Sequence, residues 1–451
     1  MSMVFLTKKW GRQCANTPGP KCWAAVLLLT TQILSAQVAA NPQISPVSDE
    51  INRELPTWLH FSGEERVRLD GLTGVGFKTV GDVYLLNRLR LNMEVRARSW
   101  LKFVLESEDA RVFGQRTRPA PASQKDAMDL RKGYVEVGSE AGPVTVRAGR
   151  QDLYFGEGRL LSDPNWSNVG KTFDAVRLTL RDGPVTADVF SGEVDQINPT
   201  GFDEPTPSEH LQGIYGSIAR LVPDATFEPY VLWRLAHGYK NEEGHLGSLD
   251  EKTYGFRWVG QLPRGFDYGA EIAKQNGSYA GDPISAWAGH WVVGFTLPDA
   301  VHRPRFFSEL NRSSGDANPQ DGSHGTFDPL FPSQHDKSGL TDLFSWSNLV
   351  HWREGFEYQL HRKLKLSVAY NDDWLASARD GLWVSGKIAA RCLSGADGTH
   401  IGQEADAALL WDVYGTQINA GDGWLFPGEF LKRATSGAHY NYVFLNIARR
   451  F

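Results

Sequence analysis

Hydrophobic and polar residues alternate most strictly between Asn87 and Ala97. One parity carries Leu89, Leu91, Met93, Val95 and Ala97, and the other carries Arg88, Arg90, Asn92, Glu94 and Arg96. Because successive side chains of a strand point to opposite faces, this stretch predicts a β-strand with one apolar wall and one guanidinium-rich wall. In a soluble sandwich the apolar wall would be core. In a membrane barrel it would face lipid, and the charged wall would face a wet lumen.

The same alternation returns along most of the chain. It is clear in residues 59–68, 101–108, 176–181, 227–235, 254–258, 266–272, 364–371 and 409–413. Short turn clusters such as Asp182-Gly183-Pro184 alternate with longer polar stretches at 114–129, 153–173, 195–209, 238–251, 313–343 and 376–400. Short turns at one end and long loops at the other are typical of an outer-membrane barrel. Few segments show the spacing of an amphipathic helix.

The N-terminus has the pattern of a secretory signal. Four basic residues precede an apolar run that begins at Trp23, and the small residues of Val38-Ala39-Ala40 precede Asn41. We therefore expect a signal peptide at 1–40, a periplasmic N-terminal segment at 41–56 and a transmembrane β-barrel at 57–451. Cys14 and Cys22 fall in the signal, which leaves Cys392 alone and excludes an internal disulfide and a cysteine-based zinc site.

The rest of the chain is acidic and strand-rich. Removal of residues 1–40 takes away four of the 47 basic residues and none of the 53 acidic ones, so the net charge becomes −10. No stretch after residue 40 approaches 18 consecutive apolar residues, so no transmembrane helix is expected. At about 10 residues per spanning strand plus connections, the chain accommodates roughly 16–18 antiparallel strands. Alternating apolar residues up to the terminal Phe451 are typical of the last strand of such a barrel.

Several motifs resemble one known family. They are Val146–Gln151, Asp163–Trp166, Phe173–Arg177, Phe327–Gly339, Ile401–Asp406 and Gly421–Phe430. In their order and spacing they resemble the alginate export family of outer-membrane porins. The resemblance implies a monomeric barrel of about 18 strands with a basic lumen, and an acidic exopolysaccharide as cargo. It places Arg90, Arg131 and Arg150 where that conduit has basic residues. The segment Tyr414–Ala420 departs from the family pattern because it contains no arginine.

The charged parity supplies candidate lumen residues. Arginine suits a conduit for carboxylated sugars, because its planar fork binds carboxylate bidentately and stays charged. The predicted conduit residues are Arg66, Arg88, Arg90, Arg96, Arg131, Arg150, Arg177 and Arg353. Arg147 and Arg150 have opposite parity, and Arg150 is preferred on the resemblance alone. The alternative is that these arginines only balance acids such as Glu64, Glu94, Glu106 and Asp174, as in any porin.

Other chemistries find little support. There is no Gly-x-Ser-x-Gly motif, and Asp372 and Asp373 point to opposite faces of a strand, so they form no acid/base pair. His335-Asp336 near Asp328 lacks a second histidine for a metal site. His351 and Arg353 share the lumen parity and are placed to bind sugar. We expect no enzyme activity, no cofactor, no metal and no nucleic-acid partner.

The sequence therefore predicts a monomeric outer-membrane channel for an anionic polysaccharide or oligosaccharide, in contact with lipid and with periplasmic secretion partners. A general or small-solute porin of the same fold is the first alternative. A secreted, soluble, β-rich enzyme acting on polysaccharide is the second.

Overall fold

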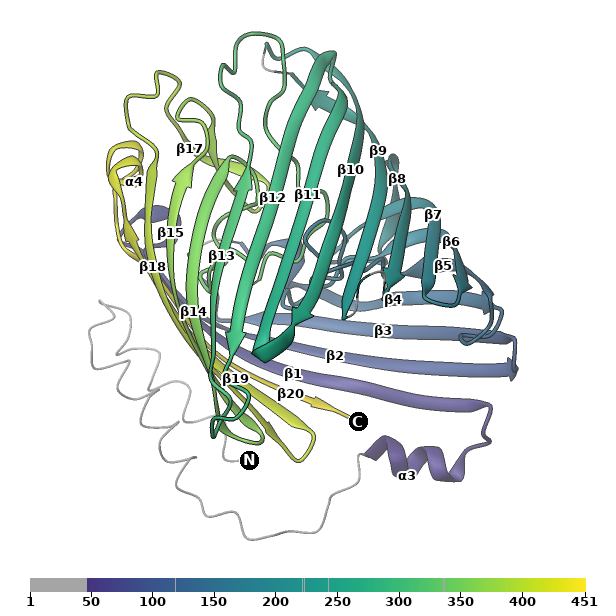
Figure 1. Ribbon diagram of the computed structural model, residues 1–451. Helices are drawn as coiled ribbons and strands as arrows, with labels where there is room; N and C mark the ends of the chain where they lie inside the picture. The colour runs from purple at the N-terminus through teal and green to yellow at the C-terminus, as the bar shows by residue number, and fades with distance from the viewer. Residues whose placement is uncertain (1–46, 118, 221, 223, 242, 336) are drawn as a thin grey trace. The chain divides into compact units, whose positions relative to one another are not determined.

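The alternating segments form one closed barrel. The computed structural model describes residues 47–451 except positions 118, 221, 223, 242 and 336. In this part of the chain, eighteen strands form a single antiparallel sheet, and β1 pairs with both β2 and β20, which closes the ring (Figure 1). The predicted fold and strand number are confirmed. Residues 1–46 contain the predicted signal peptide and the first part of the predicted N-terminal segment 41–56, and these lie outside the described residues. The rest of that segment includes a short helix, Val47–Glu54.

The strands follow one another around the ring in chain order. Their bounds are β1 Leu59–Thr73, β2 Gly81–Arg98, β3 Leu101–Phe113, β4 Asp126–Val137, β5 Val144–Gln151, β6 Phe173–Asp182, β7 Val185–Gln196, β8 Glu204–Ala219, β9 Ala225–Lys240, β10 Leu246–Leu262, β11 Phe266–Tyr279, β12 Asp282–Thr296, β13 Arg305–Ser313, β14 Leu349–His361, β15 Leu364–Leu375, β18 His400–Val413, β19 Thr416–Pro427 and β20 Tyr440–Arg450. A hairpin of β16 (Gly381–Val384) and β17 (Lys387–Arg391) lies in the connection after β15. The helices are α3 (Val47–Glu54) and α4 (Glu429–Ala434).

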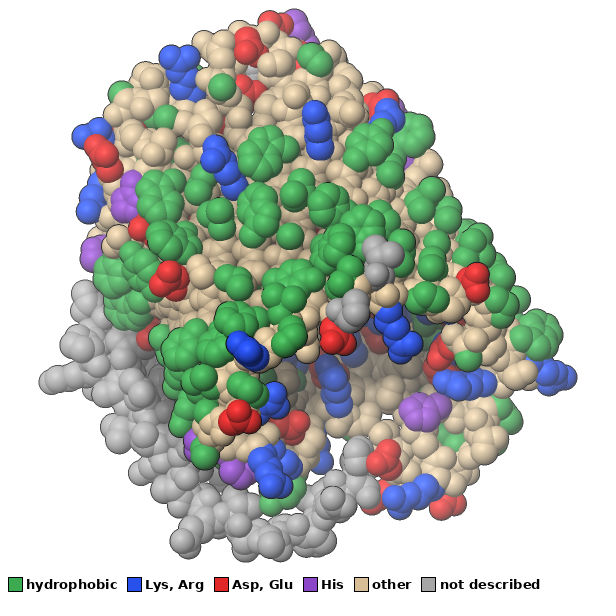
Figure 2. Space-filling view, viewed as in Figure 1, with side chains coloured by type: hydrophobic (Ala, Val, Ile, Leu, Met, Phe, Trp, Pro, Cys, Tyr) green, Lys and Arg blue, Asp and Glu red, His purple; other side chains and the backbone are tan. Residues whose placement is uncertain are grey.

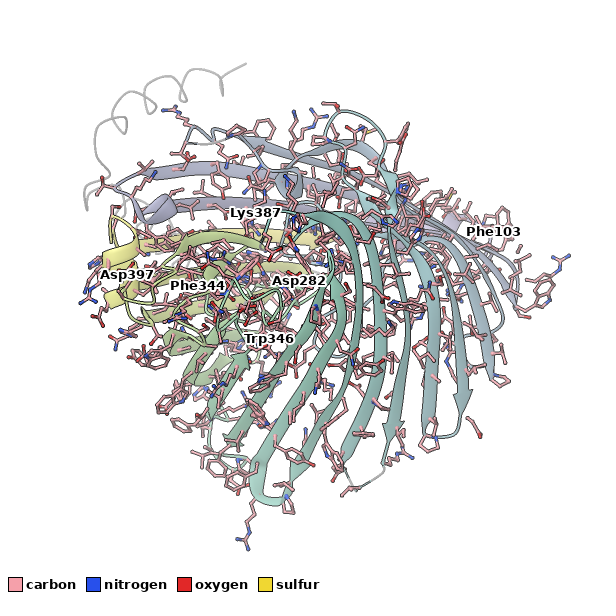
Figure 3. The ribbon with its side chains drawn as sticks, turned by 90° about the horizontal axis from the view of Figure 1, so that it is seen from above. Phe103, Asp282, Phe344, Trp346, Lys387 and Asp397 are labelled. Atoms are coloured by element: carbon pink, nitrogen blue, oxygen red, sulfur yellow. The ribbon has the colours of Figure 1, made fainter. Side chains whose placement is uncertain are left out.

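The apolar parity covers the outside of the barrel. Leu91 is 48% exposed and Val176 is 54% exposed, whereas Arg90 on the opposite parity of β2 is only 8% exposed. Hydrophobic side chains spread over the strands in Figure 2, and charged ones gather toward the two ends. Seen from above, Phe103 lies at the outer side of the ring, whereas Phe344 and Trp346 lie within it (Figure 3). This is the arrangement of a barrel whose outer wall meets hydrocarbon.

The connections differ in length at the two ends. Short turns such as 99–100, 183–184 and 414–415 lie at one end, which we call the turn end. The connections 114–125, 152–172, 314–348 and 376–399 lie at the other, which we call the loop end. The predicted stretches 195–209 and 238–251 are largely strand, because β7 to β10 continue into them.

Chain closure and the helices complete the fold. Gly63 and Phe451 exchange backbone hydrogen bonds of 2.7 and 3.0 Å, and a Cβ on Gly63 would meet the Phe451 ring at 2.6 Å. A glycine is therefore required where the last residue reaches the first strand. None of the helices within the described residues is long and apolar enough to cross a membrane.

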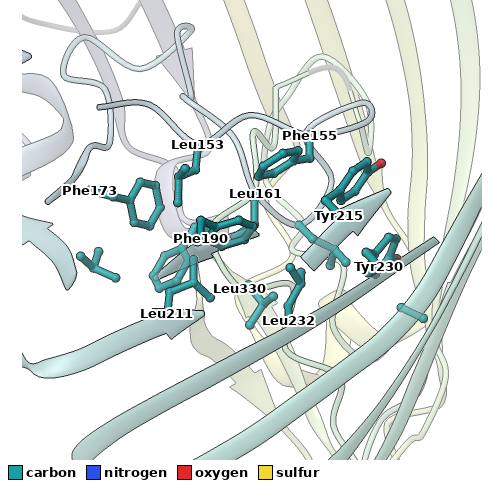
Figure 4. Close-up of a cluster of buried hydrophobic side chains, with 14 of the residues drawn as sticks. Leu153, Phe155, Leu161, Phe173, Phe190, Leu211, Tyr215, Tyr230, Leu232 and Leu330 are labelled. Carbon is teal, nitrogen blue, oxygen red and sulfur yellow. The ribbon is translucent and has the colours of Figure 1, made fainter. Parts of the chain in front are cut away.

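Two of the long connections fold into the barrel. Leu153, Phe155 and Leu161 from loop 152–172 pack against Phe190 and Tyr215, which point inward from β7 and β8 (Figure 4). Residues of loop 314–348 join the same buried cluster, including Phe327, Leu330 and Trp346. We call loops 152–172 and 314–348 together the plug. The interior is therefore partly packed, although a barrel of this size alone would enclose an open channel.

Candidate functional site: an arginine-lined bore and its plug

Inward arginines on β1 and β2 hold loop 152–172 by its oxygens. Arg66 Nη2 donates to the carbonyl of Ser167 at 2.8 Å. Arg88 is fully buried and donates to the carbonyls of Asn165 and Ser167 at 3.1 and 3.2 Å. Arg90 donates to Asn165 Oδ1 at 2.9 Å. The stretch that dominates the sequence pattern thus supplies the donors that anchor the plug.

The loop contributes an aromatic contact at the same place. The guanidinium of Arg68 lies over the indole of Trp166, 4.1 Å from the ring centroid. His335 of loop 314–348 stacks on Trp166, with the two ring centroids 3.7 Å apart. His335 Nδ1 also lies 2.6 Å from the Asp342 carboxylate. This histidine is therefore used in packing the two loops together. Its neighbour Asp336 lies outside the described residues.

The two plug loops also pair through their backbones. Leu161 and Phe331 form an isolated parallel bridge, with the Ser162 amide donating to the Phe331 carbonyl at 3.0 Å. The Phe331 amide donates to the carbonyl of Leu160 at 2.8 Å. The second loop is tied in turn to β18, where Glu404 accepts a 3.0 Å hydrogen bond from the Thr341 amide. The plug is a single hydrogen-bonded unit anchored on β1, β2 and β18, which lie on one side of the ring with only β19 and β20 between β18 and β1.

Arg131 fixes the near end of loop 152–172. It is 4% exposed and lies 2.7 Å from both Asp152 and Asp163, and it also pairs with Glu106. In the pairing of β3 with β4, Glu106 lies opposite Lys132 and Ser107 opposite Leu130, so Arg131 is an extra residue in β4. This bulge allows Arg131 to point inward beside Lys132. Burial alone would raise the pKa of the Asp163 carboxyl, but the charges of Arg131 and Arg90 lower it. This aspartate is therefore an ionised anchor for the loop.

A cavity remains inside the barrel beyond the plug. It encloses about 190 Å³ and is lined by charged groups of both signs: Arg159, Arg305, Lys337 and Arg353 with Glu157, Glu309, Glu357 and His290. Arg159 donates to Glu309 at 2.9 Å, and Arg353 lies 5.5 Å from the Phe307 ring centroid. Burial would raise the pKa of Glu157, but Arg159, His290 and Arg257 lower it to about 2. The cavity offers fixed cations beside an aromatic face, a combination suited to a polar solute.

The sequence matches the alginate export family over residues 57–446. The chain belongs to the alginate export family. The family match together with the 18-strand barrel places this chain in the outer membrane. Several solved structures share the fold. Pseudomonas aeruginosa OpdK with vanillate has 11% identity and a TM-score of 0.58, and the alignment covers 87% of this chain and 98% of that one. A BenF-like porin from Pseudomonas fluorescens Pf-5 has 8% identity and the same TM-score and coverage. P. aeruginosa OccK11 (OpdR) has 12% identity and a TM-score of 0.55, over 87% of this chain and 96% of that one. No curated protein sequence matches the chain significantly.

Most of the predicted conduit residues of this alginate-export barrel lie on its inner wall. Arg66, Arg88, Arg90, Arg131 and Arg353 are all less than 9% exposed among inward-facing groups. Arg177 also faces inward, 2.8 Å from Asp188 and 5.0 Å from the Phe155 ring centroid. Arg96 has the inward parity but lies near the turn end of β2, where its side chain is 60% exposed beside Glu94. Their role in conduction stays a prediction.

Arg150 has a partly buried side chain that pairs with acids, and its place in the conduit, preferred over that of Arg147, stays a prediction. Its parity is that of Val144 and Val146, which are exposed on the outer wall. Its Nε lies 3.0 Å from Asp174. Arg147 has the inward parity and lies over the ring of Tyr134 at 4.4 Å. The two arginines thus have opposite parity in β5, and which of them lines the conduit is not decided by this geometry.

The predicted balancing acids do pair with the arginines. Arg88 pairs with Glu64, Arg96 with Glu94, Arg131 with Glu106 and Arg150 with Asp174. The inner wall is therefore a mosaic of ion pairs and not a purely basic surface. His351 and Asp373 also form a fully buried 2.8 Å pair, whereas Asp372 contacts His400, so the two neighbouring aspartates do lie on opposite faces.

Sequence reasoning missed several cavity residues. Arg159 and Lys337 belong to the plug, where no alternation fixes the direction of a side chain. Arg305 is the first residue of β13, and His290 lies within β12. Arg68 could have been found, because it shares the parity of Arg66 on the same strand.

Proposed function

We propose that this barrel passes an anionic saccharide of the polyuronate type through its bore, by diffusion and without chemistry. One observation carries the proposal. The Arg66 guanidinium donates hydrogen bonds to uncharged oxygens of Asn165, Ser167 and Asn168, and to no carboxylate. The charges that act on it are those of three arginines, Arg88, Arg68 and Arg90, and of one acid, Glu64. When loop 152–172 withdraws, this cluster presents guanidinium donors to the bore.

A polyuronate fits such a track. It carries one carboxylate per sugar, and each carboxylate can accept the two parallel hydrogen bonds that an arginine donates. Passage also requires that no single site hold the chain too tightly. The mosaic of acids along the wall supports that requirement, because Arg68, Arg88 and Arg90 would each be shared between a wall carboxylate and the solute. The charged cavity beyond the plug, with Arg305 and Arg353, would extend the track.

A second candidate is a porin for small carboxylates. The described cavity is small, and its basic and acidic side chains nearly balance, which favours a short solute over a polymer. The solved structure of the similar porin OpdK contains vanillate, a small aromatic carboxylate. Both candidates predict anion preference, so only the length of the preferred solute separates them.

Planar bilayer recordings test the proposal. Wild-type channels should favour anions in a KCl gradient, and mannuronate oligomers added to one side should block the current. Arg353→Gln should move the reversal potential toward zero, because it removes a cation from the cavity. The matched control is Arg111→Gln, an exposed arginine paired with Asp109 on the outward parity of β3. Block by small carboxylates but not by oligomers would favour the second candidate. An unchanged reversal potential in Arg353→Gln would remove this residue from the conduit.

A further inference from the structure

The barrel wall has an unpaired edge at the loop end of β4. β5 pairs only with residues 133–137 of β4, because the chain leaves β5 at Gln151 and enters the bore as part of the plug. Residues 126–132 therefore pair with β3 on one side and have no β5 partner on the other. We call this segment the β4 edge. The connection 197–203 from the β7–β8 hairpin reaches it, where the Asp203 amide donates to Asp129 Oδ1 at 3.1 Å.

Three carboxylates meet at this junction. Asp126 and Asp129 come from the β4 edge and Asp203 from the connection, and one oxygen of each lies within 4.8 Å of the others. Their exposed fractions are 1%, 3% and 9%. Carboxylates this close and this buried repel one another strongly, since little solvent screens their charges. Either a bound cation or bound protons must offset this repulsion.

A second observation concerns one carboxylate oxygen of Asp126. Its Oδ1 is buried, and no hydrogen-bond donor reaches it within the described residues. A buried carboxylate oxygen without a donor or cation is costly. The charges recorded around Asp126 are those of Asp203, Asp129, Glu108 and Asp109, all of them acidic. The described residues thus give this buried oxygen neither a hydrogen-bond donor nor, among these charges, a cation.

The neighbouring basic groups do not fill the site. Arg150 Nη1 lies 3.9 Å from Asp129 Oδ2, but its Nε and Nη2 donate to Asp174 at 3.0 and 3.1 Å. Its Nε also lies 3.2 Å from Asp195. The Lys171 amine lies over the Phe331 ring, 5.5 Å from its centroid. Lys125 precedes Asp126 with an exposed side chain. One guanidinium shared among several acids leaves a negative excess at the three aspartates.

We propose that Asp126, Asp129 and Asp203 bind a calcium ion that fastens the connection 197–203 to the β4 edge. Ca²⁺ takes six to eight oxygen ligands at about 2.3–2.6 Å, and carboxylates can bind it with one or both oxygens. Oxygens on opposite sides of such an ion lie about 5 Å apart, so three oxygens within 4.8 Å of one another can share one ion. Mg²⁺ needs a tighter octahedron and keeps more of its water. The ion would close the wall where β5 turns away.

Isothermal titration of the refolded mature chain in detergent tests this site. The protein is first stripped with EDTA and transferred to chelator-free buffer with 0.15 M KCl. Wild type should bind one Ca²⁺ per chain. Asp126→Asn and Asp203→Asn should each weaken binding by at least about tenfold, because each removes a charged ligand. The matched control, Glu204→Gln, removes the exposed acid next to Asp203 and should bind like wild type.

Three results would overturn the proposal. They are no Ca²⁺ uptake by wild type at millimolar concentration, wild-type Ca²⁺ affinity in both aspartate variants, or tighter binding of Mg²⁺ than of Ca²⁺. Heat-modified migration on gels checks that the variants fold. If they do not, crystals of wild type soaked in Tb³⁺ decide the matter. Anomalous density between the three aspartates supports the site, and its absence there refutes it.

Discussion

The indole of Trp166 and the imidazole of His335 lie face to face, with centroids 3.7 Å apart and planes inclined by 6°. They come from the two plug loops, which are far apart in the chain. Arg68 lies on Trp166 from the wall, and Phe444 of β20 meets it edge-on at 4.7 Å. This contact joins both loops to the barrel at one point. Whether the bore conducts depends on how easily such contacts release the plug.

Removal of the indole should loosen the plug. We expect Trp166→Ala to cost less than the roughly 3–5 kcal/mol of a fully buried aromatic, on the order of 2 kcal/mol, because the indole is only partly buried. The closed arrangement would be populated less, because an opening equilibrium shifts tenfold for each 1.4 kcal/mol or so. Single-channel recordings should show larger and more frequent conductance steps. Trp352→Ala, on the exposed outer wall, is the control and should conduct like wild type. Identical current traces for wild type and Trp166→Ala would contradict a gating role for the plug.

Acid should release the plug through Glu157. The pKa of this loop carboxyl is lowered to about 2 by Arg159, His290 and Arg257, although burial opposes the shift. A lowered pKa means that the pairing stabilises the plug fully above about pH 4.5 and is lost as the pH falls toward 2. Conductance should therefore rise between pH 4.5 and 2.

Glu157→Gln isolates this effect. The variant should conduct more than wild type at pH 7 and should lose most of the rise in acid, because the amide has no charge to lose. Glu243→Gln, an exposed acid in the connection after β9, should keep the wild-type pH profile. A wild-type profile in Glu157→Gln would show that another group opens the channel.

A charge on the outer wall should destabilise the barrel according to depth. Val176→Lys places an amine on an outward position of β6 that is 54% exposed, and it should cost about 2–4 kcal/mol if the position lies near the bilayer midplane. Val185→Lys at the turn end of β7 should cost only about 0–1 kcal/mol. Urea titration in lipid vesicles, followed by tryptophan fluorescence, measures both. Equal costs would argue against lipid contact at Val176.

The alternation of apolar and charged residues made the direction of the wall side chains predictable. The loops inside the barrel have no such alternation, so the direction of their side chains could not be predicted. The strict alternation from Asn87 to Ala97 assigned Arg88 and Arg90 to the inner face and Leu91 to the outer face, as the structure has them. The same rule gave Arg147 and Arg150 opposite faces, but it could not say which of them serves the conduit. Loop residues such as Arg159 and Asp203 gave no directional signal, because irregular backbone has no period. Their positions depend on contacts with residues far away in the chain.

Uptake of labelled sugars into proteoliposomes tests the central claim most directly. Vesicles with wild-type protein are given a mannuronate octamer or a neutral mannan octamer of equal length. We predict faster entry of the acidic octamer, a further increase in Trp166→Ala, and loss of the preference in high salt, which screens exposed charges. Equal entry of the two octamers at low salt would contradict a bore that selects anionic saccharides.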